Sequence, residues 1–173
     1  WQASTFPTHI RDKITVIHDG VDTDVLKPNS HAQFTLDSGK VLTRDDEVIT
    51  FVNRALEPYR GFHVFMRSLP TLLTERSSAQ ILIVGKEGVS YGAHPADGMS
   101  WRQRFVNEIF PKLDDSQRSR VHFLNIIPYD RFISLMQVSR VHVYLTYPFV
   151  LSWSLLEAMS VGCAVVASDT QPL

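Results

Sequence analysis

Five short apolar runs, spaced along the chain, constrain its fold more than any other feature. The runs are Val48 to Val52, Ile81 to Val84, Val121 to Leu124, Val141 to Leu145 and Ala164 to Ala167. They lack the apolar-polar alternation of half-buried strands, which is typical of parallel strands covered on both faces. Helical patterns separate the runs, so the sequence predicts an α/β fold with a doubly wound, Rossmann-like parallel sheet.

Helical spacing marks the segments between these runs. Apolar residues three and four positions apart extend from Phe62 to Leu73, and a second set from Trp101 to Phe110 ends at Pro111. A third helix is expected after Pro128, and a fourth begins near Ser152. The sequence therefore supplies one helix for each of the four connections in the sheet.

The first forty-five residues do not follow this pattern. Residues 14–17 predict an additional strand that ends at the Asp19-Gly20 turn, and residues 25–40 have the Pro, Asn, Ser and Gly content of a linker. We therefore expect residues 14–45 to be an interdomain strand and linker, and residues 46–173 to be the globular domain. The chain lacks an initiator Met and stops soon after the last run, so we expect a fragment of a longer polypeptide, truncated at the carboxyl end of this domain.

Composition bears on partners and on location. The formal net charge is -1, which gives no support to a nucleic-acid surface or to a polybasic membrane patch. The single cysteine, Cys163, cannot form an internal disulfide, and its apolar neighbours predict a small buried residue in a reducing compartment. No signal peptide or run of about eighteen apolar residues is present, so we expect a cytoplasmic protein.

Ligands of doubly wound sheets bind at the carboxyl ends of the strands, so the residues that follow each run are candidates for a site. They are Asn53 and Arg54, Gly85 to Gly88, Asn125 to Pro128, Thr146 to Val150, and Asp169 with Thr170. A basic side chain, a glycine-rich loop and a helix start therefore meet at one edge. This combination favours a phosphorylated ligand.

Glu157 lies close to the start of the fourth predicted helix. Ser152 and Ser154 are good N-cap residues there, and the backbone N–H groups behind them are suited to hold an anion. Glu157 either accepts hydrogen bonds from ligand hydroxyls or is simply an acidic residue favoured by the helix dipole.

Five pieces of the sequence, in order over residues 14–170, resemble the C-terminal nucleotide-sugar-binding domain of family 4 (group 1) glycosyltransferases, which have the GT-B fold. The pieces are His18 to Asp22, Asn53 to Ala55 with Arg60-Gly61, Ile83 to Gly88, Val121 to Leu124, and Leu155 to Asp169. The resemblance implies a retaining, metal-independent enzyme that transfers a sugar from a UDP-sugar or GDP-sugar to an acceptor. The acceptor, a glycan or a lipid-linked saccharide, would be held by a separate N-terminal domain.

Under this resemblance, the chain is the donor half of a GT-B enzyme, and residues 1–13 are a remnant of the acceptor domain. The fragment would be inactive alone. The full-length enzyme would serve polysaccharide biosynthesis, with peripheral membrane association where the acceptor is lipid-linked. No cofactor is expected besides the donor substrate.

The resemblance also assigns roles to residues. Arg54 would pair with the diphosphate, for which a planar guanidinium is well shaped. Glu157 matches the second Glu of the family's Glu, seven residues, Glu motif and would bind the ribose hydroxyls. These two are the candidate catalytic residues. The family usually has a Lys five residues after the Arg; Tyr59 stands there, and the role passes to Arg60.

Further donor contacts are expected from two strand ends and from the start of the fourth helix. These residues are Gly85, Asn125, Ile126, Ser152, Trp153 and Ser154. Phe149 stands where the family motif has its first Glu, and Phe cannot accept a hydrogen bond from a sugar hydroxyl. Either the chain belongs to a branch with a different turn here, or the domain has lost transfer activity. The aromatic side chains of Tyr147, Phe149 and Trp153 either stack on the sugar or base or belong to the core.

The seven histidines are scattered, and none has the spacing of a metal site. His122 and His142 lie in predicted strands and are expected to be core residues with satisfied hydrogen bonds. Three functions remain open: the donor domain of a glycosyltransferase, a nucleotide-sugar-binding module without transfer activity, and a nucleotide-sugar epimerase.

Overall fold

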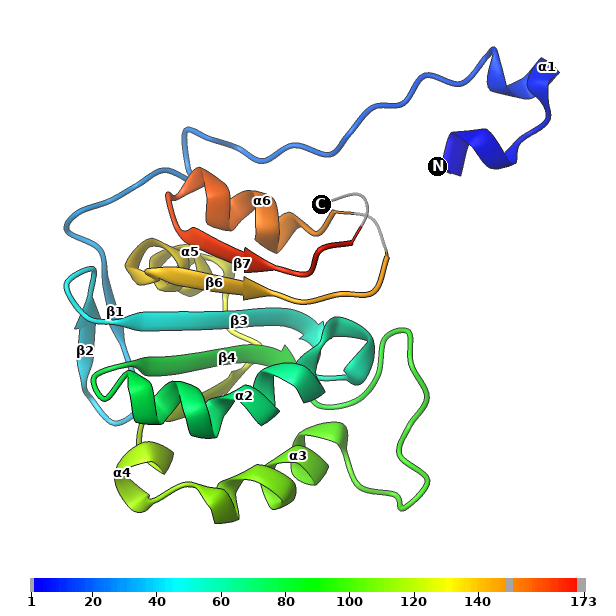
Figure 1. Ribbon diagram of the computed structural model, residues 1–173. Helices are drawn as coiled ribbons and strands as arrows, with labels where there is room; N and C mark the ends of the chain where they lie inside the picture. The colour runs from blue at the N-terminus through cyan, green and yellow to red at the C-terminus, as the bar shows by residue number, and fades with distance from the viewer. Residues whose placement is uncertain (1, 149–150, 171–173) are drawn as a thin grey trace.

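A five-stranded parallel sheet with helices on both faces forms the body of the protein (Figure 1). The computed structural model describes residues 2–148 and 151–170. The strand order is β5-β4-β3-β6-β7, and every neighbouring pair is parallel. The strands are β3 (Val48–Ala55), β4 (Gln80–Lys86), β5 (Val121–Asn125), β6 (Val141–Tyr144) and β7 (Ala164–Ala167). The predicted fold class, a doubly wound α/β sheet, is confirmed.

Helices connect the strands. Those within the sheet domain are α2 (Phe62–Glu75), α3 (Trp101–Ile109), α4 (Asp115–Arg118), α5 (Tyr129–Val138) and α6 (Trp153–Ser160), with the 3-10 turns η2 (Pro58–Arg60) and η3 (Phe110–Lys112). Near the amino terminus lie η1 (Gln2–Thr5) and α1 (Thr8–Arg11). The four long helices begin within a residue or two of their predicted starts. None of the helices in the described part of the chain is long and apolar enough to cross a membrane.

Two apolar clusters cover the two faces of the sheet. On one face, α2 and α3 pack on β3 and β4, where the rings of Phe51 and Phe65 stack with centroids 4.6 Å apart. On the other face, α5 and α6 pack on the same sheet through side chains such as Leu135 and Ala158. Because β3 is covered on both faces, its first five residues are all buried, as a run of apolar residues without alternation predicts.

A β-hairpin precedes the sheet where the sequence predicted a linker. Strands β1 (Gln33–Thr35) and β2 (Val41–Thr43) pair antiparallel. Phe34 and Leu42 are buried and join the apolar cluster on the α5 face. The linker prediction for residues 25–40 is therefore wrong. These strands are three residues long, too short for their alternation to rise above the turn residues around them.

The predicted strand at residues 14–17 is also wrong. This segment has no regular secondary structure, and Val16 and Ile17 are 62% and 86% exposed. Its apolar side chains find no partner strand among the described residues, and a lone strand is not stable in water. That residues 14–45 connect two domains stays a prediction.

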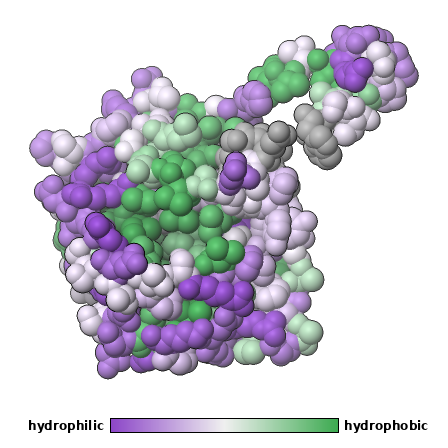
Figure 2. Space-filling model, in the orientation of Figure 1, coloured by the Kyte–Doolittle hydropathy of each residue, from purple (hydrophilic) through white to green (hydrophobic). Residues whose placement is uncertain are grey.

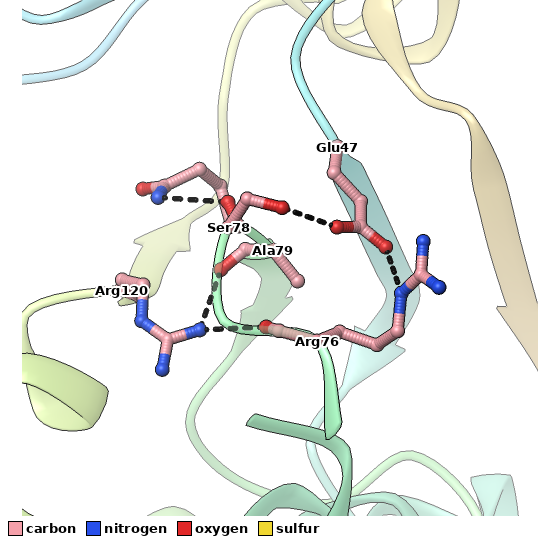
Figure 3. A network of polar contacts seen from close by, with 6 residues as sticks. Glu47, Arg76, Ser78, Ala79 and Arg120 are labelled. Carbon is pink, nitrogen blue, oxygen red and sulfur yellow. Dashed lines mark hydrogen bonds and ion pairs between the residues drawn. The ribbon is translucent and has the colours of Figure 1, made fainter. Parts of the chain in front are cut away.

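Polar contacts close the amino end of the sheet (Figure 3). Glu47, just before β3, accepts hydrogen bonds from Arg76 and, at 2.6 Å, from the Ser78 hydroxyl. The Arg120 guanidinium donates to the backbone carbonyls of Arg76 and Ala79. This network lies at the opposite end of the strands from the carboxyl edge, and it provides matched control positions for tests of that edge.

One part of the sheet is left uncovered. The cluster under α2 and α3 extends over β3, β4 and β5 and reaches β6 through Val141 and Val143, so among the described residues the outer face of β7 is the part left open (Figure 1). Val166 on β7 is 55% exposed and Val64 on α2 is 51% exposed. An apolar area accordingly lies over this part of the molecule in Figure 2.

Candidate functional site

A cavity of about 430 Å³ opens at the carboxyl edge of the sheet. It lies between the ends of β3 and β4 and the segment that follows β5. Its lining residues are Asn53, Arg54, Val84, Lys86, Ile126, Ile127, Tyr129 and Phe132. Two basic side chains therefore stand beside an apolar wall. That arrangement suits a ligand with an anionic group and a less polar part.

Arg54 and Glu157, the two candidate catalytic residues, are brought to the same region through Tyr129. Tyr129 lines the cavity together with Arg54. Its hydroxyl donates a hydrogen bond to Glu157 Oε1 at 3.1 Å. A chain of contacts therefore runs from the cavity to the carboxylate on α6.

Glu157 is held in a poorly hydrated place. It lies in the middle of α6 and is 8% exposed. Burial raises the pKa of the Glu157 carboxyl, and the hydrogen bond from Tyr129 opposes part of this rise. A carboxylate that has lost much of its hydration is stabilised when ligand hydroxyls donate hydrogen bonds in place of the lost water.

The start of α6 is capped by its own side chains. Ser152 Oγ accepts the backbone N–H of Ser154 at 3.2 Å and lies 2.7 Å from Ser154 Oγ. The Ser154 N–H is therefore engaged by the cap, and its predicted role as a phosphate donor requires this hydrogen bond to break. The Trp153 ring is 63% exposed and donates from Nε1 to Asp19 at 3.1 Å.

Gly85 is required by packing. A Cβ at this position would lie 2.8 Å from the Asn53 carbonyl oxygen and 2.8 Å from Leu56 Cδ2. The glycine therefore lets the end of β4 approach the end of β3. Lys86, which follows it, reaches the cavity; the sequence analysis passed over this residue although it lies in the glycine-rich piece.

Asn125 and Ile126, both predicted to contact the donor, have different surroundings. Asn125 has a left-handed backbone (φ 54°), and its Oδ1 accepts a hydrogen bond from Arg102 at 2.9 Å. The Asn125 side chain is thus bound to α3 and is not among the residues that line the cavity. Ile126 lines the cavity and is 72% exposed.

Arg60 is the last residue of η2, its side chain reaches the segment after β6, and it is not among the cavity-lining residues. Its Nη1 donates to Thr146 Oγ1 at 3.3 Å, and its guanidinium lies 5.1 Å from the centre of the Tyr91 ring. Burial raises the pKa of the Tyr144 hydroxyl, while the Arg60 charge lowers it. Arg60 therefore places a positive charge at the same edge of the sheet as Arg54.

Glu57 is a buried acid that the sequence analysis missed. It is completely buried, and its carboxylate accepts the backbone N–H groups of Ser90, Tyr91 and Gly92 at 2.9 to 3.1 Å. A Glu before a Pro in a turn is normally a surface residue, and its partners lie more than thirty positions away. The available signal was the segment after β4, whose N–H groups need an acceptor from elsewhere.

Two of the aromatic residues singled out in the sequence, Tyr147 and Trp153, are not core residues. Tyr147 is 53% exposed, with its ring 5.4 Å from that of Tyr59, and Trp153 is likewise exposed. Stacking on a ligand stays a prediction for both. Phe149 lies outside the described residues.

The two strand histidines match the prediction only in part. His142 is a core residue, but its buried Nε2 has no hydrogen-bond partner among the described residues, and His122 is only half-buried. His142 is fully buried, with Nδ1 3.1 Å from Thr50 Oγ1, and burial lowers its pKa to about 4. His122 Nε2 lies 3.1 Å from Gln80 Oε1. Within residues 2–148 and 151–170, no three His, Cys, Asp or Glu side chains form a group that could hold a metal ion.

Several solved structures share the fold of this chain. The C-terminal domain of the group 1 glycosyltransferase LpcC from Francisella tularensis has a TM-score of 0.64 at 17% identity, over 86% of this chain and 70% of that one. Sucrose-phosphate synthase from Thermosynechococcus elongatus has a TM-score of 0.64 at 19% identity, over 87% and 34%. HepE from Anabaena, solved with UDP and glucose, has a TM-score of 0.59 at 21% identity, over 90% and 38%.

The chain thus spans about a third of sucrose-phosphate synthase and of HepE, and these likenesses show the fold. No curated protein sequence matches the chain. Two family profiles do. One, described as Glycosyl transferase family 4 group, matches residues 1–26, and the other, described as Glycosyl transferases group 1, matches residues 46–172. The second covers most of the chain, and the protein therefore belongs to the group 1 glycosyltransferases, as a C-terminal domain of the GT-B type.

Proposed function

We propose that this chain is the donor-binding half of a retaining glycosyltransferase, which holds a nucleoside-diphosphate sugar at the carboxyl edge of the sheet. The observation that carries the proposal is the cavity lined by Arg54 and Lys86, with Tyr129 leading from it to Glu157. The similar fold of HepE, which was solved with UDP and glucose, supports a ligand of this class.

Each of these groups has a role in the proposed transfer. As the bond from the sugar to the diphosphate breaks, negative charge builds up on the leaving group, and fixed cations lower the barrier. Arg54 and Lys86 supply such charge from the cavity, so the proposal needs no metal ion or cofactor. Glu157 accepts hydrogen bonds from the ribose hydroxyls and so orients the nucleotide.

The acceptor belongs to another part of the enzyme in this proposal. The family 4 profile that matches residues 1–26 supports the view that residues 1–13 end an acceptor domain. Transfer to a glycan or to a lipid-linked saccharide therefore requires the longer protein, and the chain alone is expected to bind the donor without turnover. A cytoplasmic location and a peripheral membrane association of the full enzyme belong to the same proposal.

The first test is a calorimetric titration of the chain with UDP and with GDP. We expect one of them to bind with a Kd of about 1 mM or tighter. Arg54→Ala should weaken that binding about tenfold or more, because a charge-assisted contact to the diphosphate is lost. Arg104→Ala, on the surface of α3 where Arg104 pairs with Asp97, is the control and should bind as the unchanged chain does. No binding of either nucleotide would refute the proposal.

A nucleotide-sugar-binding module without transfer activity is the second candidate, and Phe149 in place of the first motif Glu is the observation that favours it. The full-length protein separates the two functions. Transfer of labelled sugar to an acceptor extract would establish the enzyme, whereas binding without transfer to any extract would favour the module.

A further inference from the structure

The Glu57 carboxylate ties together two loops at the carboxyl edge. Glu57 follows β3, and the residues that it binds belong to the loop between β4 and α3, beside the turn after β3 in Figure 1. Three successive N–H groups, from residues 90–92, converge on the one carboxylate. Hydrogen bonds to an ionised acceptor are roughly twice as strong as neutral ones, so this contact fixes the backbone of the loop. We name residues 57, 90, 91 and 92 the Glu57 clamp.

Glycines lie at two close approaches around the Glu57 turn. A Cβ on Gly92 would lie 3.0 Å from Glu57 Oε2, so the glycine allows the backbone to reach the acid. On the other side, Gly61 has a φ of 69°, and a Cβ there would lie 2.2 Å from Leu145 Cβ. The turn from Glu57 to Gly61 is therefore held between the loop after β4 and the end of β6.

The clamp determines where Tyr91 lies, and Tyr91 lies against Arg60. The Tyr91 N–H is bound to Glu57, and the guanidinium of Arg60 lies 5.1 Å from the centre of the Tyr91 ring. Arg60 is three residues after Glu57 on the same turn. A cation over an aromatic ring gains about 0.5–1 kcal/mol at an exposed site, so the ring adds to the contacts that hold the Arg60 guanidinium.

The restricted guanidinium points along the carboxyl edge. Arg60 Nη1 donates to Thr146 Oγ1, just beyond β6, and the Arg60 charge acts on the buried Tyr144 hydroxyl. Arg54, at the end of β3, lines the cavity of the same edge. Arg60 thus presents charge from the β6 side of the edge, and Arg54 presents it from the cavity side.

Resting on the proposed function, we infer that Glu57 is a positioning residue for the donor: the Glu57 clamp holds Tyr91 and, through it, Arg60 in the orientation that meets the diphosphate. The acid itself touches no donor atom. Its loss therefore affects recognition of the diphosphate and leaves recognition of the nucleoside unchanged.

The test compares a nucleoside diphosphate with its nucleoside, using UDP and uridine or GDP and guanosine according to which nucleotide the chain binds. Glu57→Gln replaces one carboxylate oxygen by an NH₂ group that faces backbone donors, so the loop is released. We expect the Kd for the diphosphate to rise roughly tenfold and the Kd for the nucleoside, measured by ligand-observed NMR, to stay the same. Glu47→Gln is the matched control, because the Glu47 carboxylate also accepts two hydrogen bonds but lies at the amino end of the sheet.

Tyr91→Leu is the second variant, in case Glu57→Gln fails to fold. Tyr91 is 48% exposed, and its ring can be removed while the backbone contacts of the clamp stay in place. The same selective loss of diphosphate affinity is expected. In an Arg60→Ala background, the Tyr91 change should have no further effect, because both act through one guanidinium.

The outcomes separate this inference from the function beneath it. If the unchanged chain binds neither UDP nor GDP, the proposed function is refuted. If the chain binds, equal losses of nucleoside and diphosphate affinity, or a Tyr91→Leu variant that binds like the unchanged chain, would overturn the role of the clamp. Additive losses from Tyr91→Leu and Arg60→Ala would overturn it as well.

Discussion

Individual buried residues make this domain sensitive to pH, in opposite directions. Glu157 is an acid whose charge is disfavoured by burial, whereas His142 is a base whose charge is disfavoured by burial. Glu157 lowers the stability of the fold at neutral pH, where a carboxyl is normally ionised. His142 lowers it in mild acid, where an imidazole would normally be protonated.

Glu157→Gln should stabilise the fold at neutral pH while it weakens nucleotide binding. Burial raises the folded-state pKa of Glu157 above its ordinary value, so its favourable contribution is complete at low pH and is lost as the pH rises through the folded pKa. A neutral Gln avoids that loss and still accepts the Tyr129 hydroxyl. Thermal melts at pH 4 and pH 7 should show the larger gain at pH 7.

Glu108→Gln provides the control of opposite sign. A hydrogen bond from Arg67 lowers the pKa of Glu108, so this carboxylate stabilises the fold above its ordinary pKa, and its replacement should lower stability at pH 7. A Glu157→Gln variant that melts below the unchanged chain at pH 7 would contradict the account of Glu157.

His142 should make the fold sensitive to mild acid. Burial lowers its pKa from 6.5 to about 4, so the neutral form stabilises the fold above pH 6.5, and this stability is lost as the pH falls through the folded pKa. Each pH unit in that window costs about 1.4 kcal/mol, which makes a full loss of about 3 kcal/mol. Urea unfolding at pH 7 and pH 4.5 measures it.

In His142→Leu, the dependence on pH should be flatter over this window. Thr50 loses one partner but keeps its 2.8 Å contact with the Ser139 hydroxyl, so the variant is expected to fold. His31→Gln, an exposed position, is the control. Equal slopes in the His142→Leu variant and the unchanged chain would show that another group causes the acid sensitivity.

The residues of the site were predictable only where they directly follow a strand of the sheet. Arg54 follows a strand, and the edge of a parallel sheet gathers such residues, so its place by the cavity is what the sequence predicts. Glu57 was missed because its partners follow the next strand, and nothing local marks it as buried. Asn125 has its amide oxygen engaged by Arg102 on α3, a contact that the sequence does not indicate, and its contact with the donor stays a prediction.

At the level of elements, length decided what the sequence could predict. The sheet strands are long enough for an apolar run to be recognised in the sequence, and a Gly or Asn marks the carboxyl end of β4 and of β5. The β1–β2 hairpin has only three residues in each strand, and its burial depends on α5, which lies nearly a hundred positions later. Residues 14–17 have the apolar composition of a strand, but no strand among the described residues pairs with them.

Phe34→Ala tests whether the hairpin is part of the folded domain. Phe34 is 2% exposed and lies beneath the Arg131 guanidinium on α5. Removing its ring should cost about 3–5 kcal/mol of unfolding free energy, the usual cost for a core Phe. Equilibrium urea unfolding provides the measurement.

Val16→Ala is the matched change in a segment without regular structure, where the side chain is 62% exposed. Its effect should stay within about 0.5 kcal/mol. If Phe34→Ala were as stable as Val16→Ala, the hairpin would not be part of the folded domain.

On the scale of the whole molecule, the fold class and the family were predictable because both depend on the order of strands, helices and short motifs along one chain. The packing of the hairpin and the Glu57 clamp were not predictable, since each depends on residues that are far apart in the sequence. The donor's base, its sugar and the acceptor depend on such loop shapes, and titration with UDP and GDP is the first step toward them.

The exposed outer face of β7 has a practical consequence for the laboratory. Exposed apolar surface of this kind promotes self-association. Aggregation, and not the free energy of unfolding, will therefore limit the concentrations at which the isolated chain can be titrated. Val166→Glu places a solubilising charge on this face, away from the α6 side that carries Glu157, and is the natural background for every variant in such assays.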